Sequence, residues 1–158
     1  MKYAELITTE CYNGPGWGVT FALQGCPHHC PGCFNPETWD FSGGKEFTPD
    51  ILAELNKALS LKHITRLSIQ GGEPLCQENL FLTCLICDTV RTKYPHIKIY
   101  IWTGYTKEAL EESCDPKISK ILDGTYADVL IDGPFIEAKK DTTLFMRGST
   151  NQRIIELT

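Results

Sequence analysis

The sequence has no long uninterrupted apolar run, and we therefore predict no membrane-spanning helix. The segment Met1–Glu5 also lacks the apolar stretch of a secretory signal, which favours the cytoplasm as the compartment of this protein. Basic residues are few, since 15 Lys and Arg stand against 20 Asp and Glu and give a formal net charge of −5. Nucleic-acid binding needs clustered positive charge, so this balance argues against nucleic acid as the main partner.

The chain also lacks internal repeats, low-complexity tracts and any linker that would divide it into parts. A length of 158 residues is enough for one domain with a real core, but not for two such domains. The apolar content of 42% and the charged content of 22% are ordinary for a soluble globular protein. We therefore expect a single domain spanning residues 1–158.

Cysteine is the residue type that the chain has in excess, with eight in total. Without a secretory signal a disulfide scaffold is unexpected, and in a reducing compartment grouped cysteines indicate metal binding or catalysis. Three cysteines are tightly grouped, at positions 26, 30 and 33. Cys84 and Cys87 lie in a predicted helix among apolar neighbours, which favours buried packing over a redox pair. Cys11, Cys76 and Cys114 stand alone and receive no role.

Short β-branched and apolar runs alternate with patterns of helical spacing along the chain. The runs predict strands at 18–23, 64–70, 97–102, 128–131 and 153–157, and helices at about 49–59 and 78–94, with one or two short helices ending at Gly124. Asp115 followed by Pro116 is typical of the start of such a short helix. This alternation predicts an α/β fold with a parallel sheet and helical crossovers.

Each unusual motif follows directly after a predicted strand, where α/β barrels and open α/β sheets place their functional sites. A complete eight-fold barrel needs about 250 residues. This chain is much shorter, so we predict a partial, incomplete parallel β/α barrel with an open side.

The most informative stretch is the loop that holds Cys26, Cys30 and Cys33 in a Cys-x3-Cys-x2-Cys pattern. The intervening Pro and Gly residues disfavour a helix and permit the tight turns that wrap three thiolates around one inorganic centre. Closed electron-transfer clusters and structural zinc sites take four protein ligands. Three thiolates on a four-iron cluster leave one iron open to substrate, which points to chemistry.

Zinc stays open on the spacing alone, because His28, His29 or Cys76 could supply a fourth ligand. Such a site would suit a zinc-stabilised interaction module without catalysis. A cluster needs neither histidine, and we expect both His28 and His29 to be exposed loop side chains.

Taken in order, the motifs are similar to those of the radical S-adenosylmethionine superfamily. Among its branches the sequence resembles most the activating proteins of anaerobic ribonucleoside-triphosphate reductase. The resemblance spans nearly the whole chain and is carried by Asn13–Gly16, Gln24–Asn35, Thr38–Trp39, Gly71–Leu75, Trp102–Tyr105, Asp132–Phe135 and Arg147–Arg153.

The resemblance implies two cofactors, a 4Fe–4S cluster on Cys26, Cys30 and Cys33 and S-adenosylmethionine. It places Gly71, Gly72 and Glu73 along the amino group of the cofactor's methionine end. Glycines let the backbone come close, and a carboxylate or carbonyl can accept from an ammonium.

Other cofactor contacts implied by the resemblance are less specific. In the wider superfamily the residue before the third cysteine is often aromatic and lies near the adenine. Here that residue is Gly32. The contact with the adenine is therefore expected from the backbone around Cys33 or from Phe34. Thr103 and Asp132 close two predicted strands, where related activases place polar contacts. A simple strand end and an Asx turn explain them equally well.

The resemblance also implies the reaction and the partners. The cluster reductively cleaves S-adenosylmethionine, and the 5′-deoxyadenosyl radical takes a hydrogen atom from a glycine Cα of the large reductase subunit. An electron donor such as flavodoxin or ferredoxin supplies the electron. Activation of another glycyl-radical enzyme, of formate-lyase type, is the alternative. The segment Arg147–Arg153 either contacts cofactor or partner, or is a solvated loop.

Overall fold

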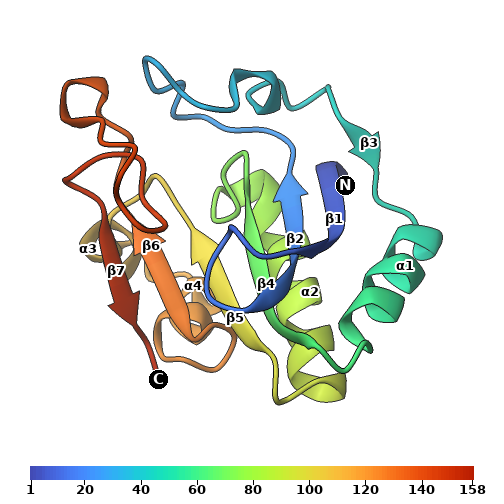
Figure 1. Cartoon of the computed structure of the whole chain (residues 1–158). Helices are drawn as coiled ribbons and strands as arrows, with labels where there is room; N and C mark the ends of the chain where they lie inside the picture. The colour runs from blue at the N-terminus through green and yellow to red at the C-terminus, as the bar shows by residue number, and fades with distance from the viewer.

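The computed structural model describes all 158 residues as a mixed α/β fold built on one seven-stranded open sheet (Figure 1). The strands are β1 (Lys2–Glu10), β2 (Trp17–Leu23), β3 (Lys45–Glu46), β4 (Ile64–Gly71), β5 (Lys98–Trp102), β6 (Val129–Asp132) and β7 (Arg153–Glu156). The helices are α1 (Pro49–Leu59), α2 (Gln77–Lys93), α3 (Lys107–Glu112) and α4 (Pro116–Leu122), with short 3-10 turns η1 (Pro36–Thr38) and η2 (Glu137–Lys139). No helix of the chain combines the length and the apolar character needed to cross a bilayer.

The sheet has the strand order β3-β1-β2-β4-β5-β6-β7. The central strands β2, β4, β5 and β6 are parallel, as predicted. The crossovers between them contain the helices. The prediction of a parallel sheet thus holds for these four strands but not at the edges, because β1 pairs antiparallel with β2 and β3, and β7 pairs antiparallel with β6. The short connection 11–16 explains why β1 and β2 are antiparallel, since a parallel strand needs a long crossover. The longer segment 133–152 between β6 and β7 contains no α-helix, only η2, and does not form a helical crossover.

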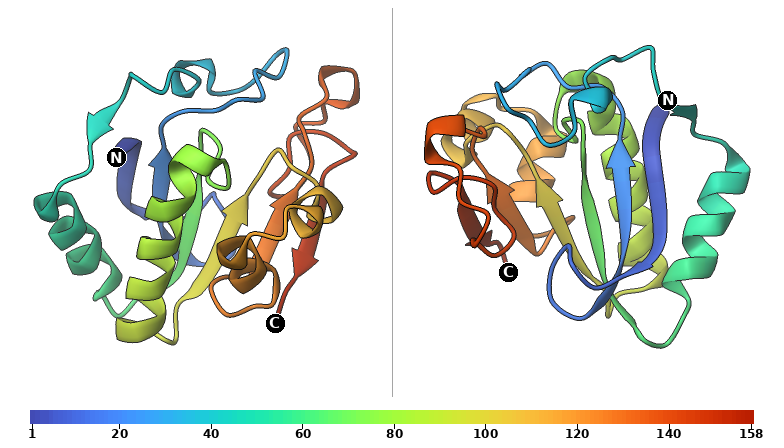
Figure 2. Two further views of the ribbon diagram at one scale, coloured as in Figure 1. Left: turned by 180° about the vertical axis from the view of Figure 1, so that it is seen from behind. Right: turned by 45° about the horizontal axis from the view of Figure 1, so that its top comes forward.

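All four helices cover the same face of the sheet, and the opposite face is lined by loops (Figure 2). Side chains alternate between these faces along each strand. On β5, Ile99 and Ile101 belong to the main core on the helical side, whereas Tyr100 belongs to a small cluster on the other face. Cys84 and Cys87 also belong to the main core, in agreement with the packing interpretation.

The face of the sheet that lacks helices carries polar side chains. On β4, Leu67 and Ile69 enter the main core, while Arg66 and Ser68 alternate with them and face the other way. Both polar side chains are fully buried. The strand β4 therefore presents apolar side chains to the helices and hydrogen-bonding side chains to the face that lacks helices.

Local sequence signals fix the helix ends where we predicted them. The Asp115 side chain caps α4 by accepting from the backbone N–H of Lys117 at 2.7 Å. Gly124, just beyond the end of α4, has φ +84, a conformation that favours glycine.

Two strands were missed in the sequence. β1 is the second strand from one edge of the sheet, and most of its residues are half-buried. Its alternation of apolar and polar residues is therefore weak. Its β-branched run Ile7–Thr9 is the signal that could have revealed it. β3 has two exposed residues and no local signature.

Candidate functional site

The three grouped cysteines lie in a loop, residues 24–41, that follows the carboxyl end of β2. The loop closes on itself, because the N–H of Gly25 donates to the carbonyl of Thr38 at 2.7 Å and that of Cys26 to Trp39 at 3.2 Å. The buried side-chain amide of Gln24 donates to two further carbonyls of the same loop. These bonds fix the base of the loop and leave its tip for the cysteines.

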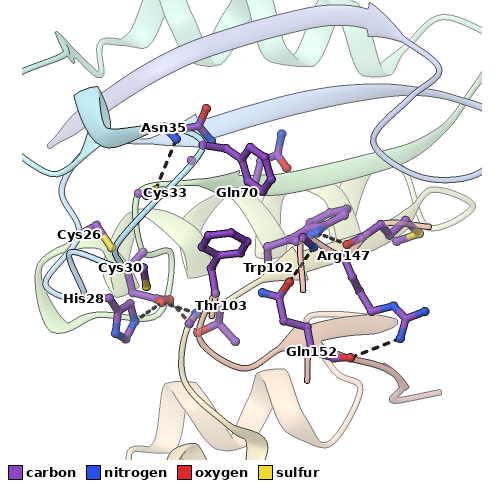
Figure 3. A pocket seen from close by; sticks show the side chains of 18 of the residues that line it. Cys26, His28, Cys30, Cys33, Asn35, Gln70, Trp102, Thr103, Arg147 and Gln152 are labelled. Carbon is purple, nitrogen blue, oxygen red and sulfur yellow. Dashed lines mark hydrogen bonds and ion pairs between the residues drawn. The ribbon is translucent and has the colours of Figure 1, made fainter. Parts of the chain in front are cut away.

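Cys26, Cys30 and Cys33 are free thiols, each half-buried, and all three line one cavity of about 650 Å³. Figure 3 shows them together on one side of this cavity. Burial raises the pKa of the Cys26 thiol, and the negative charge of Glu73 acts in the same direction. A metal centre that binds the thiolate would offset this effect.

The three candidate fourth ligands are otherwise engaged. The Cys76 thiol donates to the backbone carbonyl of Glu73 at 3.2 Å, and burial raises its pKa to about 12. The His29 ring stacks on Trp39 at 4.7 Å between centroids. His28 was expected to be exposed, but its side chain is only 19% exposed and bonds to Glu73 at 2.6 Å.

The donor set fits an iron–sulfur cluster better than one metal ion. A single tetrahedral zinc ion holds its sulfur ligands about 3.8 Å from one another, given its usual zinc–sulfur distance. No three His, Cys, Asp or Glu side chains of this chain converge in that way. Three thiols on a Pro- and Gly-containing loop form the sulfur-only set that iron–sulfur clusters use.

The Gly-Gly-Glu-Pro turn after β4 packs directly on the cysteine loop. The N–H of Gly72 donates to the carbonyl of Leu23, and that of Glu73 to the carbonyl of Gly25, both at 2.9 Å. A Cβ on Gly72 would overlap the backbone of Gly25, including its carbonyl oxygen. Only glycine at position 72 allows this close approach.

The structure brings several predicted site residues together. Gly71, Gly72, Glu73 and Thr103 line the cavity with the three cysteines. Thr103 is buried, and its hydroxyl donates to the Glu73 carboxylate at 2.8 Å. The ends of β4 and β5 therefore form one continuous wall, as expected for neighbouring parallel strands.

Phe34 and Gly32 occupy different positions. Phe34 lines the cavity, is 55% exposed and packs on Phe135 with ring centroids 5.2 Å apart. Gly32 is not among the lining residues; its φ is +74, and a Cβ there would lie 2.7 Å from Oε1 of Glu137. Gly32 thus serves a tight turn beside the C-terminal segment.

Asp132 lies away from the other predicted site residues and does not line the cavity. Its carboxylate is 1% exposed and accepts from the backbone N–H of Lys107 at 2.7 Å and from the Arg153 guanidinium at 2.9 and 2.5 Å. It thereby joins the end of β6 to the start of α3 and to β7.

For Arg147–Arg153 two interpretations were open, a contact segment or a solvated loop, and the structure places part of this segment on the cavity. Arg147, Gly148 and Gln152 line the cavity. Figure 3 shows Arg147 and Gln152 on the side opposite the cysteines. The Gln152 side chain accepts from the N–H of Gly148 at 2.8 Å and donates to the carbonyl of Gly133 at 3.0 Å. This wall is therefore an ordered turn.

The indole of Trp102 ties the opposite wall to the sheet. Its Nε1–H donates to the carbonyl of Met146 at 2.9 Å, and both residues line the cavity. Sequence reasoning missed this contact, because nothing local links position 102 to position 146.

Comparisons with known proteins show which chains this one is similar to. Residues 12–155 match a family model described as a 4Fe-4S single cluster domain. The chain is 36% identical over 160 residues to the anaerobic ribonucleoside-triphosphate reductase-activating protein of Vibrio cholerae serotype O1, covering 100% of this chain and 99% of the relative. It is 33% identical over 159 residues to the protein of that name from Escherichia coli K12, covering 99% of each chain. It is 36% identical over 154 residues to that of Enterobacteria phage T4, covering 98% of this chain and 93% of the relative.

Proposed function

Because the chain belongs to the family of anaerobic ribonucleoside-triphosphate reductase-activating proteins, we propose that it is a radical S-adenosylmethionine activase. In this proposal residues 1–158 form one radical S-adenosylmethionine domain, an incomplete barrel whose open side admits the substrate. The substrate is a glycine of the large subunit of anaerobic ribonucleoside-triphosphate reductase. The product is a glycyl radical on that subunit.

One observation carries the proposal: three free thiols on one loop face the same cavity as the glycine turn after β4. We assign the 4Fe–4S cluster to Cys26, Cys30 and Cys33. The other candidate ligands are engaged within the protein, so one iron is left for an outside chelator. When bound, the cluster and S-adenosylmethionine would supply one-electron cleavage of the cofactor's sulfur–carbon bond and the radical that removes hydrogen from the glycine Cα.

The residues of the chain hold and orient the cofactor. Gly71 and Gly72 carry no side chain and let the backbone approach the methionine end, where a carbonyl can accept from the ammonium. Phe34, beside Cys33, offers an aromatic surface to the adenine. Thr103 bonds to Glu73 and so holds this glycine turn against the end of the neighbouring strand. Fixed positions for these groups lower the entropic barrier of the reaction.

The open cavity accounts for a protein substrate. The residues around it include exposed Tyr12 and Phe34, at 67% and 55%, which offer apolar surface to a partner. A docked reductase subunit would cover this opening and exclude water from the reaction. Flavodoxin or ferredoxin remains the proposed electron donor.

The decisive experiment is an anaerobic cleavage assay. The protein is reconstituted with iron and sulfide, reduced and mixed with S-adenosylmethionine, and 5′-deoxyadenosine release is measured. We expect a brown protein and release in the wild type, and loss of both in Cys30→Ser. Cys11→Ser is the matched control, because Cys11 is exposed and does not line the cavity. No release from the reconstituted wild type would refute the proposal.

A second experiment identifies the partner. The activated protein is mixed with the large reductase subunit or with a formate-lyase-type enzyme, and the glycyl-radical doublet is followed by electron paramagnetic resonance. We expect the doublet only with the reductase. A doublet only with the formate-lyase-type enzyme would reassign the partner while keeping the chemistry.

A further inference from the structure

The carboxylate of Glu73 is buried, at 1% exposure, and accepts four hydrogen bonds from the protein. Oε1 accepts from the N–H of Leu75 at 2.9 Å and from the hydroxyl of Thr103 at 2.8 Å. Oε2 accepts from the N–H of Gly104 at 2.7 Å and from Nε2 of His28 at 2.6 Å. A carboxylate has about four acceptor positions, so this one is filled.

These four donors come from three separate segments. Leu75 belongs to the turn after β4, Thr103 and Gly104 to the turn after β5, and His28 to the tip of the cysteine loop. Glu73 is therefore a junction at which the three segments meet. A junction with every acceptor occupied does not need the ammonium of a cofactor as a further partner.

His28 is the only residue of 27–33 that makes a hydrogen bond outside the loop. The base of the loop has its own backbone bonds to the Gly-Gly-Glu-Pro turn, but the tip between Cys26 and Cys33 has none. The hydrogen bond of His28 is therefore the one that ties the tip to the strand ends.

The ring of His28 packs closely between Tyr105 and Gly104. It packs edge-on against Tyr105, with centroids 4.5 Å apart, and lies over Gly104, where an added Cβ would come within 2.6 Å of the ring. The next residue, His29, is exposed and makes no hydrogen bond through its side chain. Two adjacent histidines thus have different surroundings: His28 bonds to Glu73 outside the loop, whereas His29 stacks on Trp39 within it.

We infer that His28 is a positioning residue, which holds the Cys26–Cys30 part of the loop against the ends of β4 and β5 through Glu73. This inference rests on the proposed function for the meaning of that position: the loop carries the cluster and the strand ends carry S-adenosylmethionine. His28 therefore sets the position of the cluster relative to that of S-adenosylmethionine. It acts through Glu73.

The test compares His28→Ala with His28→Gln, which can return an N–H donor near the position of Nε2, and with Gly104→Ala, which fills the space that the His28 ring occupies and changes no polar group. His29→Asn is the matched control, because His29 has φ +47 and asparagine tolerates that conformation. One readout needs no cluster: the rate at which iodoacetamide alkylates Cys26 and Cys30 in the metal-free, reduced protein, resolved by peptide mass spectrometry.

We expect alkylation to accelerate about tenfold in His28→Ala and Gly104→Ala, because each loses the hydrogen bond from His28 to the Glu73 carboxylate. His28→Ala removes the donor, and Gly104→Ala displaces the ring. His28→Gln should recover much of the protection, and His29→Asn should behave as wild type. In the loaded enzyme we expect the KM for S-adenosylmethionine to rise about tenfold while kcat changes much less. A merely structural loss would lower thermal stability without this split.

The two proposals fail differently. Wild-type protein that releases no 5′-deoxyadenosine refutes the proposed function, and the alkylation rates still decide the role of His28. Wild-type alkylation rates and KM in both His28→Ala and Gly104→Ala would overturn the positioning role. A His28→Gln protein as impaired as His28→Ala, in both readouts, would also overturn it, since the donor would then not be what matters.

Discussion

Arg66 and Glu10 form an ion pair that is closed off from solvent: Nη1 lies 2.8 Å from Oε1, and the side chains are 0% and 1% exposed. Arg66 also donates to the carbonyl of Asn13 at 2.7 Å. Gly18, its register partner on β2, leaves room for the guanidinium, since a Cβ there would lie 2.5 Å from the guanidinium carbon. The pair thereby fixes the β1–β2 loop, whose Asn13 lines the cavity.

Replacing Glu10 by Gln should destabilise the protein strongly. The change leaves the buried guanidinium of Arg66 without a counter-charge, which typically costs about 3 kcal/mol. The measurement is urea unfolding of the metal-free, reduced protein, followed by circular dichroism. Glu46→Gln is the control, because it breaks an exposed pair with Lys2 and should leave the midpoint near that of wild type. Equal midpoints for Glu10→Gln and wild type would show that the pair does not stabilise the fold.

The same carboxylate predicts a pH dependence. Burial alone would raise the pKa of Glu10, but the hydrogen bonds from Arg66 and from its other donors, Asn13 among them, hold it below its ordinary 4.5. A lowered folded-state pKa gives stability that is present above the unfolded value and is lost as pH falls through the folded one. Wild-type stability should therefore fall below about pH 4.5.

Glu10→Gln lacks this titration. The difference between its urea midpoint and that of wild type should therefore shrink as the pH falls from about 5 to about 3. Other carboxylates contribute to acid unfolding equally in both proteins, and the comparison removes them. A difference that stays constant over this interval would contradict the assignment to Glu10.

Much of the fold follows from local patterns in the sequence. The helical spacing of apolar residues and the Pro49 start located α1, and the Asp115 cap located α4. The central strands were recognisable because their residues that face the helices, such as Ile99 and Ile101 on β5, are apolar and β-branched. β1 escaped detection because it is half-buried and carries charged residues among its apolar ones. Its antiparallel direction depends on pairing with β2, which no local pattern encodes.

The candidate site was predictable as a set of motifs, but not as a set of contacts. The spacing of the cysteines and the order of the motifs predicted which loops meet at the strand ends. Nothing in the spacing indicates that His28 would reach Glu73, which lies 45 positions away. Nothing local pairs Asp132 with Arg153 either, at a separation of 21. Such pairings follow from the tertiary arrangement of the strands.

Asp132→Asn separates a structural role from a cofactor contact. The carboxylate bonds to Lys107 N–H and to Arg153, and it lies off the cavity. We expect a loss of stability of about 1 kcal/mol, modest because Arg153 is half exposed, and an unchanged KM for S-adenosylmethionine. Urea unfolding and the 5′-deoxyadenosine assay measure the two effects. A raised KM at unchanged stability would instead place Asp132 in cofactor binding.

Gly72→Ala should separate the glycine turn from the cysteine loop. The new Cβ would overlap the backbone of Gly25, which cannot rotate away as a side chain could. The two backbone bonds that join these segments, from Gly72 to Leu23 and from Glu73 to Gly25, would then lengthen or break. A shift of about 1 Å in a positioning element can reduce the rate about a hundredfold, so we expect a large fall in kcat/KM for S-adenosylmethionine.

The Gly72→Ala measurement needs two readouts from the same samples, iron content after reconstitution and 5′-deoxyadenosine release as a function of cofactor concentration. Because the substitution leaves Cys26, Cys30 and Cys33 in place, iron content should fall much less than kcat/KM does. Equal losses of both would mean that the turn supports the cluster loop itself. A variant with wild-type iron and wild-type kcat/KM would show that the close approach of Gly72 to Gly25 has no part in placing the cofactor.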